Sequence, residues 1–483
     1  MSSSETFYWH DYETFGADAA YDRPVQFAGQ RTDLDLNPVG EPLLIYARPP
    51  RDYLPQPGAC LVTGILPQVA EERGVCEAEF IAAIEREFLV PGTCGVGYNS
   101  LRFDDTVTRF TLYRNLRDAY AREYGDGRSR WDLIDAMRTA HALRPEGIEW
   151  PLREDDQPSF RLEDLTAANG LAQGRAHDAL VDVHATIALA KLLRERQPRL
   201  FQWLYDHRGK DAVQGLVDMQ SPQPLLHVSG MFGAARGNLS LILPLAWHPR
   251  NRNELFCADL RGDAALLLEL SPEELRERVY RRSEDFAEGE ERPGLKSVHM
   301  NRCPVLLPAK MADEQVAERA QLDLEACRRN LVLLREHERR HPGALRDKLR
   351  AFSDGPPPEA ERDPDLMLYS GGFLSRQDRR ALDGVLAQAP EELAGRTVVF
   401  EDSRLDEMLF RYRARNYPET LDEEERERWE QFCFERLSEG GGRGLDLETF
   451  HRELDERLAD PALSEEQRQI LQGLQRWGDS LLA

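Results

Sequence analysis

Two carboxylates end an aromatic, strand-like run near the start of the chain. Asp11 and Glu13 follow Phe7, Tyr8 and Trp9. Because side chains alternate between the two faces of a strand, residues two apart point the same way, and both carboxylates share one face. Like charges held this close repel unless a cation joins them, and carboxylate oxygens are preferred ligands of Mg²⁺ and Mn²⁺. The pair therefore indicates either a metal site or, as the common alternative, a solvated strand end.

Two further acidic residues and a histidine lie at the boundaries of later elements. Asp104 comes directly after a short predicted strand over 95–99, where, together with Asp105, it is also compatible with a charge pair at a helix N-terminus. His177 stands at the start of a predicted helix, and Asp182 follows five residues later. A histidine at a helix start is usually a cap or a packed imidazole. Beside a carboxylate site it suits a general base, because imidazole titrates near neutral pH.

Arginines and aromatic residues alternate between residues 109 and 144. Eight arginines against five acidic residues leave a local charge of +3. The aromatic residues among them are Tyr113, Tyr120, Tyr124 and Trp131. Guanidinium groups bind phosphates and aromatic rings stack on bases, so this pattern suits a single nucleic-acid strand. An amphipathic helix pair with aromatic core positions explains it equally well.

Length and composition limit the class of protein. A chain of 483 residues, 41% of them hydrophobic, is expected to form about three domains. The net charge of −24 argues against a general nucleic-acid coat protein but leaves room for a local basic channel. Seven cysteines without a Cys-x-x-Cys give neither a disulfide framework nor a zinc-site spacing. No apolar run has the length of a membrane span and the first residues lack a secretion signal, so we expect a cytoplasmic protein with no membrane contact.

The spacing of apolar and turn residues predicts the elements that position these side chains. Strands over 26–31 and 42–48 follow the first run as an antiparallel meander. Apolar spacing predicts a helix over 77–89. Residues 224 to about 304 show a β-rich, barrel-like pattern. Later helices are predicted over 322–340, 375–388, 404–415, 423–439 and 463–482. Consecutive prolines within 353–358 indicate a linker.

The acidic residues and His177 resemble the three motifs of the DEDDh exonucleases. The first motif is Asp11-x-Glu13, the second runs from Asn99 to Asp104, and the third joins His177 to Asp182, all in the family's order. Other segments resemble the bacterial exonuclease I family within that superfamily, namely 10–16, 22–24, 98–99, 102–105, 130–132, 143–147, 227–233 and 409–416. The resemblance covers nearly the whole chain.

This resemblance implies an α/β fold with three domains. Residues 1–198 are expected to form an RNase H-like DEDDh exonuclease domain, with a mixed sheet and flanking helices. Residues 199–352 are expected to form an SH3-like β domain with helical additions. A linker over 353–365 would then lead to an α-helical C-terminal domain over 366–483.

The resemblance also implies the chemistry. Two Mg²⁺ ions, for which Mn²⁺ can substitute, would be bound by Asp11, Glu13, Asp104 and Asp182, with His177 as the general base. The expected enzyme is an exodeoxyribonuclease that processively hydrolyses single-stranded DNA from its 3′ end to 5′-mononucleotides, in DNA repair and recombination. Polarity and sugar preference rest on the resemblance alone.

Substrate and partner contacts follow from the same resemblance. The positions that match substrate contacts are Glu13, Arg161, Arg109, Tyr120, Tyr124, Arg138, Lys210 and Asn253. Tyr124 replaces a tryptophan of the family and keeps a stacking face. Arg144 and Arg335 match positions that bind the acidic, apolar C-terminal tail of single-stranded-DNA-binding protein, whereas Trp203 stands where the family has a tyrosine. A monomer is expected.

Two alternative functions remain open at this point. An exoribonuclease of the ribonuclease T kind, which trims RNA 3′ ends, would share every catalytic residue. A catalytically inactive DNA-repair scaffold could bind the single-stranded-DNA-binding protein without cleaving DNA. The presence of all five active-site residues argues against the scaffold.

Overall fold

The computed structural model describes residues 5–171, 178–355, 360–395 and 397–481. Contacts divide the chain into two compact units. The first consists of residues 1–129, 173–187 and 359–483, and the second of residues 130–172 and 188–358. Among the helices of the described residues, none combines the length and apolar composition needed to cross a membrane.

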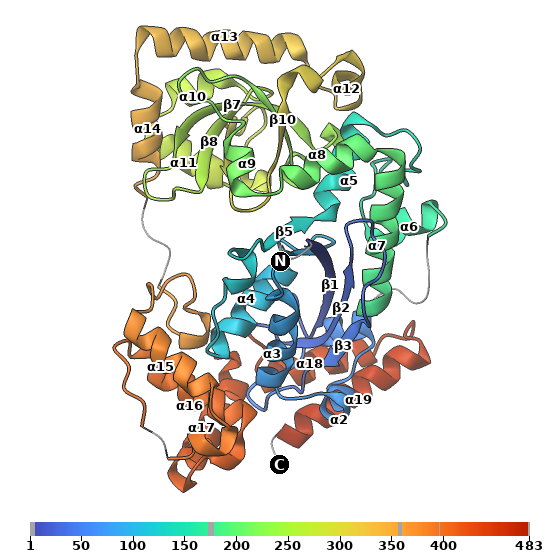
Figure 1. Cartoon of the computed structure of the whole chain (residues 1–483), viewed down its shortest axis with the longest axis vertical. Helices are drawn as coiled ribbons and strands as arrows, with labels where there is room; N and C mark the ends of the chain where they lie inside the picture. Colours follow the sequence, from blue (N-terminus) through green and yellow to red (C-terminus); the bar gives the residue numbers. More distant parts are fainter. Residues whose placement is uncertain (1–4, 172–177, 356–359, 396, 482–483) are drawn as a thin grey trace. The chain divides into compact units, whose positions relative to one another are not determined.

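A mixed sheet organises the first unit, with β1 (Thr6–Thr14) at its centre (Figure 1). The strand order is β3-β2-β1-β4, and β5 (Ser129–Asp132), which begins at the last residue of this unit, follows β4. β2 (Pro24–Thr32) pairs antiparallel with β1 and with β3 (Leu43–Tyr46), whereas β4 (Thr93–Gly97) runs parallel to β1. The predicted antiparallel meander of the first three strands is therefore confirmed.

The alternation of side chains along β1 separates a packed face from a polar one. Tyr8 and Tyr12 pack against α3 (Glu77–Phe88) and α4 (Asp104–Arg114) in one buried cluster. Burying an aromatic ring of this kind stabilises the fold by roughly 2 kcal/mol. The intervening odd-numbered residues, which include both carboxylates, face the other side of the sheet, where α7 (Ala179–Arg196) lies. Packing on one face thus fixes the direction of the acidic side chains on the other.

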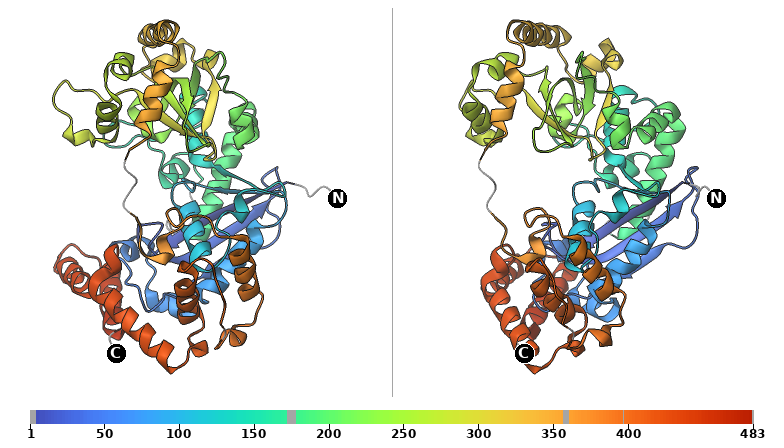
Figure 2. Two further views of the ribbon diagram at one scale, coloured as in Figure 1. Left: turned by 90° about the vertical axis from the view of Figure 1, so that its left-hand side faces the viewer. Right: turned by 60° about the vertical axis from the view of Figure 1, so that its left-hand side comes forward.

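The C-terminal segment belongs to the same compact unit as the N-terminal sheet. Its helices are α15 (Arg376–Leu386), α16 (Arg404–Asn416), α17 (Glu423–Glu439), α18 (Leu447–Leu458) and α19 (Glu465–Leu481). α18 and α19 pack on α1 (Pro57–Thr63), and α19 also packs on α2 (Pro67–Arg73), which places the red end of the chain beside the blue one in Figure 2. The predicted helical character of this segment is confirmed.

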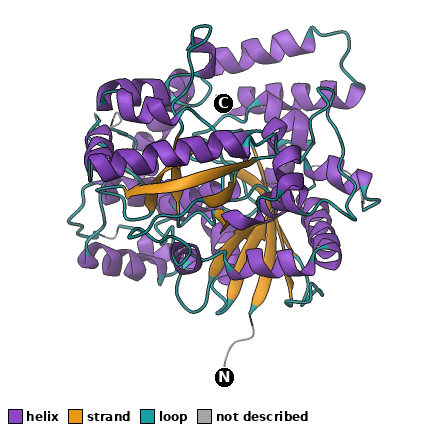
Figure 3. Ribbon diagram, turned by 90° about the horizontal axis from the view of Figure 1, so that it is seen from above, coloured by secondary structure: helices purple, strands orange, loops and turns teal. Residues whose placement is uncertain are grey.

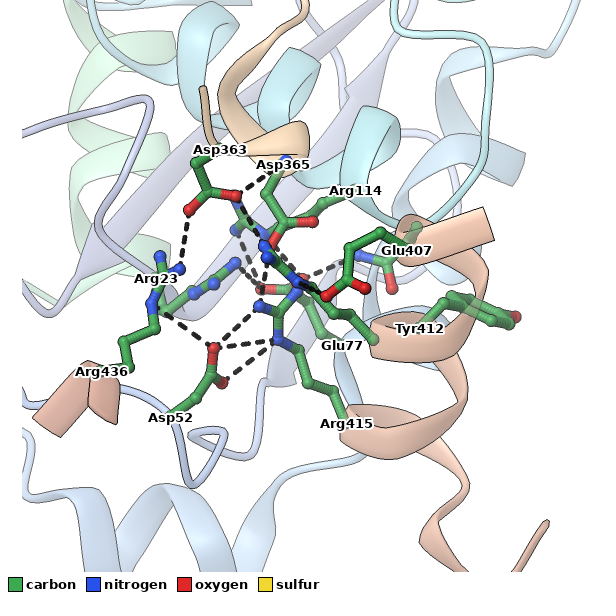
Figure 4. A network of polar contacts seen from close by, with 12 residues as sticks. Arg23, Asp52, Glu77, Arg114, Asp363, Asp365, Glu407, Tyr412, Arg415 and Arg436 are labelled. Atoms are coloured by element: carbon green, nitrogen blue, oxygen red, sulfur yellow. Dashed lines mark hydrogen bonds and ion pairs between the residues drawn. The ribbon is translucent and has the colours of Figure 1, made fainter. Parts of the chain in front are cut away.

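A buried network of ion pairs also joins these two segments (Figure 4). Arg415 of α16 donates to Asp52 at 2.8 Å and to Asp365 at 2.7 Å. Arg436 of α17 pairs with Asp363 at 2.7 Å. Burial by itself would raise the pKa of Asp52 and of Asp365, but the surrounding guanidinium groups, Arg415 first, hold both pKa values well below the usual range. Both carboxylates are therefore charged in the folded protein.

The second unit contains an antiparallel sheet in the order β10-β6-β7-β8-β9, drawn with orange strands in Figure 3. Its strands are β6 (Leu225–Val228), β7 (Leu239–Trp247), β8 (Glu254–Asp259), β9 (Leu295–His299) and β10 (Val305–Pro308). Its helices are α5 (Leu133–Leu143), α6 (Leu162–Ala168), α8 (Pro198–Asp206), α9 (Lys210–Gln214), α10 (Ala264–Glu269), α11 (Pro272–Tyr280), α12 (Glu314–Arg319), α13 (Leu324–Arg340) and α14 (Ala344–Phe352). The sheet and the helices from α8 to α14 agree with the expected small β domain with helical additions, whereas α5 and α6 come from residues that were expected to belong to the exonuclease domain.

Asp104 and Asp105 begin α4, which confirms the predicted charge pair at a helix N-terminus, whereas the predicted strand end directly before Asp104 is wrong. β4 ends at Gly97 rather than at Asn99, and Asp104 is the first residue of α4 instead of following a strand directly. Asn99 has a φ of 61°, a left-handed conformation that no strand continues. The residues between Gly97 and Asp104 therefore form a turn that leads into the helix.

Candidate active site

Three of the predicted carboxylates meet at the polar face of β1. Single oxygen atoms of Asp11, Glu13 and Asp182 all lie within 4.8 Å of one another. Asp182 comes from the first turn of α7, whose Ala179 N–H donates to the Gln26 side chain at 3.3 Å. Because Gln26 lies opposite Glu13 in the β1–β2 ladder, this bond holds the start of α7 beside the cluster.

Asp104 reaches the same end of β1 from the neighbouring helix. Pairing between β1 and β4 stops at Trp9 and Val96, so the last residues of β1 have no strand partner on that edge. The Tyr12 N–H donates instead to Asp104 Oδ1 at 3.1 Å. The structure thus brings all four predicted carboxylates to one place, while His177 lies outside the described residues.

Asp11 and Glu13 lie in a strongly acidic environment. Burial, followed by repulsion from Asp182 and Asp104, raises the pKa of Glu13 to about 8. Burial and the charges of Asp104, Glu13 and Asp182 raise the pKa of Asp11 well above its usual value. Across the described ranges, no lysine or arginine pairs with Asp11 or Glu13. Carboxylate oxygens gathered this closely, with no basic partner for Asp11 or Glu13 among the described residues, fit hard divalent cations such as Mg²⁺ or Mn²⁺.

The predicted DNA-facing residues of the first unit lie around α4. The Arg109 guanidinium forms two bonds to Glu123, at 2.6 and 3.0 Å, and lies 5.5 Å from the centre of the Tyr120 ring. Tyr124 is 59% exposed, which leaves its ring available for stacking. Arg109 is therefore already held by a carboxylate beside the Tyr120 ring.

The local charge of +3 does not produce a correspondingly basic surface. Besides Arg109, the arginines of this stretch that pair with acidic residues are Arg114 with Glu77, Arg117 with Glu85, Arg122 with Asp105, Arg128 with Asp126 and Arg138 with Asp135. Several of the partners lie outside residues 109–144, where the local count does not include them. Much of the predicted positive charge therefore serves internal ion pairs.

Two predicted substrate contacts of the second unit lie side by side. The Lys210 Nζ donates to Asn253 Oδ1 at 2.6 Å, so α9 and the loop before β8 present them together. The Arg138 guanidinium packs against Gly230, where a Cβ would come within 2.9 Å of it. Arg161 has a side chain that is 66% exposed and pairs with Glu163.

The two arginines predicted to bind a partner each line an apolar pocket of the second unit. Arg144 and Trp203 border a pocket of about 410 Å³ together with Leu200 and Met311. Arg335 borders a larger pocket of about 690 Å³ between α13, α14 and β7. Each site combines a positive group with apolar walls.

Two exposed aromatic residues in the segment before α15 were not predicted from the sequence as DNA contacts. The Tyr369 ring packs edge-on against Phe110 at 5.5 Å and is 61% exposed. Burial and the nearby Tyr369 hydroxyl raise the pKa of Tyr120 to about 12, which places this loop beside a predicted contact. Phe373, four residues later, is 98% exposed. The available signal was a pair of aromatic residues flanking two glycines before a predicted helix.

Comparison with known proteins identifies the family. Residues 8–190 match the family described as "Exonuclease", residues 208–352 the "Exonuclease I SH3-like domain", and residues 362–481 the "Exonuclease I C-terminal domain". The curated exodeoxyribonuclease I of Escherichia coli is 50% identical over 425 residues, 88% of each chain. The chain belongs to the exonuclease I family. The resemblance drawn from the motifs, the fold class and the enzyme class are thereby confirmed.

Two further members of the exonuclease I family match this chain along its whole length. The exodeoxyribonuclease I of Haemophilus influenzae is 42% identical over 485 residues, 100% of both chains. The zinc-bound crystal structure of the E. coli exonuclease I complex with single-stranded DNA is 45% identical in sequence to this chain and superposes on it with a TM-score of 0.93. The match covers 100% of both chains. This member of the exonuclease I family is therefore a nuclease of the same three-part construction.

Proposed function

We propose that this protein is a Mg²⁺-dependent exonuclease that hydrolyses single-stranded DNA from the 3′ end and releases 5′-mononucleotides. The observation that carries the proposal is the group of buried and half-buried carboxylates at the end of β1, in which neither Asp11 nor Glu13 has a basic partner among the described residues. The relative of known structure that was solved with single-stranded DNA and with zinc supports both the substrate class and a divalent ion. Two Mg²⁺ ions, replaceable by Mn²⁺, fit the all-oxygen donor set better than zinc does.

In this proposal the carboxylates bind and orient the ions, and a histidine moves the proton. Bound divalent ions would polarise the phosphodiester and stabilise charge on the attacking and leaving oxygens. Asp11, Glu13 and Asp182 provide one compact set of oxygen donors, and Asp104 is held against β1 by the Tyr12 N–H. His177, five residues before Asp182 in the sequence, would accept the proton of the attacking water, because imidazole titrates near neutral pH.

The DNA strand would be bound through phosphates and rings rather than base edges. Arg109, Arg138, Arg161, Lys210 and Asn253 supply cationic or hydrogen-bonding groups for the backbone. The aromatic residues proposed to stack on bases are Tyr120 and Tyr124, together with Tyr369 and Phe373. Since every base has a π face, binding of this kind is independent of sequence. Such contacts along a strand would also favour processive cleavage.

We further propose that the pockets beside Arg144 and Arg335 bind the C-terminal tail of single-stranded-DNA-binding protein. An acidic and apolar peptide needs a positive group next to an apolar pocket, and both sites offer that combination. Recruitment by this partner would place a monomeric, cytoplasmic enzyme on DNA during repair and recombination. We propose three domains, 1–198, 199–352 and 366–483, with a linker over 353–365. The Arg335 pocket would belong to the second domain, whereas the Arg144 pocket would be lined by residues of the first and second domains.

The polarity, the sugar preference and the metal requirement can be tested together. An oligonucleotide labelled at its 5′ or 3′ end is incubated with the full-length protein in Mg²⁺, and an RNA of the same sequence is incubated in parallel. We expect early release of the 3′ label as a mononucleotide from DNA, and no release in EDTA. Faster trimming of the RNA would support the ribonuclease T alternative instead, and absence of cleavage of either strand would support the scaffold.

Replacing Asp11 tests the site itself. Asp11→Ala removes a shared oxygen donor of the cluster, and we expect DNA cleavage to fall roughly 10³-fold or more, since ion-mediated charge stabilisation amounts to several kcal/mol. The control is Asp178→Ala, which removes an exposed carboxylate near Glu13 from outside the cluster and should leave cleavage within about twofold. Substantial Mg²⁺-dependent cleavage by the folded Asp11→Ala variant would refute the assignment.

A further inference from the structure

Tyr12, the residue between the two β1 carboxylates, joins β1 to α4 through both its backbone and its side chain. Its N–H donates to Asp104 Oδ1 at 3.1 Å. Its hydroxyl oxygen lies 3.0 Å from Thr108 Oγ1, one turn further along α4. The Thr108 Oγ1 also lies 2.8 Å from the backbone oxygen of Asp104. Three contacts therefore close a ring that contains one proposed metal ligand.

The chemistry of these groups settles which atom donates in each bond. The backbone oxygen of Asp104 can only accept, so the single hydroxyl proton of Thr108 is directed to it. The Thr108 oxygen is then left to accept, and the Tyr12 hydroxyl donates to it. This arrangement satisfies both hydroxyl groups and requires both to be present.

Burial makes the ring of bonds rigid. Tyr12 is 5% exposed, Thr108 1% and Asp104 4%. The Tyr12 ring is packed against Phe27, with ring centres 4.8 Å apart, and belongs to the cluster that anchors α3 and α4 to the sheet. Water does not reach the hydroxyl pair to replace a lost partner, so each bond constrains geometry more strongly than a surface bond does.

We propose that Tyr12 is a positioning residue for the reaction: its hydroxyl, through Thr108, sets the first turn of α4 and thereby the Asp104 carboxylate relative to Asp11 and Glu13. This inference rests on the proposed function, in which Asp104 helps to bind a divalent ion. Groups that orient a metal ligand through a hydrogen bond typically change metal affinity or activity 10- to 100-fold when removed. The phenyl ring at this position supplies the packing, and the hydroxyl supplies the alignment.

The central variant is Tyr12→Phe in the full-length protein, compared with Tyr8→Phe. Tyr8 lies on the same strand and the same face, is 2% exposed, and its hydroxyl has no hydrogen-bond partner among the described residues. For Tyr12→Phe we expect about 10-fold weaker Mn²⁺ binding by calorimetry and about 10-fold lower kcat on a single-stranded oligonucleotide, with KM unchanged. For Tyr8→Phe we expect wild-type values in all three measurements.

Variants of the partner residue test the bond from the other side. Thr108→Val keeps the shape and removes the hydroxyl, so it should reproduce the Tyr12→Phe values, and the double variant should be no worse than either single one. Thr108→Ser restores the hydroxyl and should recover Mn²⁺ affinity and kcat. If a Tyr12 variant failed to fold, the contrast between Thr108→Val and Thr108→Ser would still decide the question.

Mn²⁺ binding and DNA cleavage distinguish the absence of a positioning role for Tyr12 from failure of the proposed function. If Tyr12→Phe and Thr108→Val bind Mn²⁺ and cleave DNA as Tyr8→Phe does, the hydroxyl pair has no positioning role although the nuclease assignment stands. If the wild-type protein itself neither binds Mn²⁺ nor cleaves DNA, the proposed function fails, and with it the inference.

Discussion

At the scale of single residues, the carboxylate cluster stores repulsion that a cation can relieve. Burial and its acidic neighbours raise the pKa of Glu13 from 4.5 to about 8 in the metal-free protein. A carboxyl whose pKa is raised by folding holds its proton longer in the folded state than in the unfolded one. Such a group costs nothing below pH 4.5, and it lowers the free energy of unfolding as the pH rises from 4.5 towards 8.

We therefore predict that the metal-free protein loses stability between pH 5 and pH 8. The loss from Glu13 is at most roughly 5 kcal/mol, as expected from the size of its pKa shift. Urea unfolding in EDTA at several pH values measures it, and saturating Mg²⁺ should largely remove it. In Glu13→Gln, whose side chain cannot ionise, the free energy of unfolding should fall less steeply with pH. A variant with the wild-type slope would contradict the prediction.

At the scale of elements, local pattern predicted those parts of the fold whose own residues carry the signal. The meander of β1, β2 and β3 follows from alternation and turn residues, and α17 was predicted to its last residue. In contrast, α18 was not predicted, because it buries only Phe450 and Leu454. Such a short apolar stripe becomes a stable helix only where α1 and α19 cover it.

In the candidate site, too, features set by neighbouring residues were predicted, whereas contacts between residues far apart in the sequence were predicted only through the family motifs or not at all. The spacing of Asp11 and Glu13 placed both carboxylates on one face of β1, and the family motifs brought Asp104 and Asp182 to them. The count of charges within residues 109–144 did not predict the surface charge, because Arg114, for example, pairs with Glu77, which lies more than 30 residues earlier in the chain. An ion pair of that separation is decided by tertiary packing, which the local charge of +3 could not reveal.

The loop that carries Tyr369 and Phe373 yields a prediction at this scale. Phe373 is 98% exposed and lies four residues after Tyr369, which is beside the predicted contact Tyr120; a large apolar ring that is exposed to this extent suits stacking on a base. We expect Phe373→Ser to weaken single-stranded DNA binding about 5- to 100-fold, with no change in melting temperature. Fluorescence anisotropy of a labelled oligonucleotide in Ca²⁺ or EDTA measures binding without cleavage. Val399→Ser, on another exposed position of the same unit, is the matched control; equal affinities for the two variants would exclude a stacking role.

At the scale of the whole molecule, the buried ion pairs between the N-terminal and C-terminal segments are the decisive feature of the first unit. Arg415 alone contacts two fully buried acids, Asp52 and Asp365, from segments about 310 residues apart in sequence. Their lowered pKa values mean that the network stabilises the fold above pH 3.8 and loses that contribution as the pH falls below it.

Breaking this network should destabilise the first unit strongly. Arg415→Met keeps most of the side-chain volume but leaves two buried carboxylates without their shared partner, and we expect a loss of about 3–5 kcal/mol in urea unfolding at pH 7. Arg443→Met removes a half-exposed pair with Asp18 in the same unit and should cost no more than about 1 kcal/mol. Similar losses for both variants would show that the network adds nothing beyond ordinary surface pairing.

The same network has a consequence for how the protein is made. During synthesis the strand that bears Asp11 and Glu13 leaves the ribosome first, whereas Arg415 and Arg436 follow roughly 400 residues later. A nascent or prematurely terminated chain therefore carries the acidic residues of β1 together with Asp52, which still lacks its ion pairs with Arg415 and Arg436. We therefore expect a chain that ends before Arg415 to leave its N-terminal sheet without the ion pairs that stabilise the first unit.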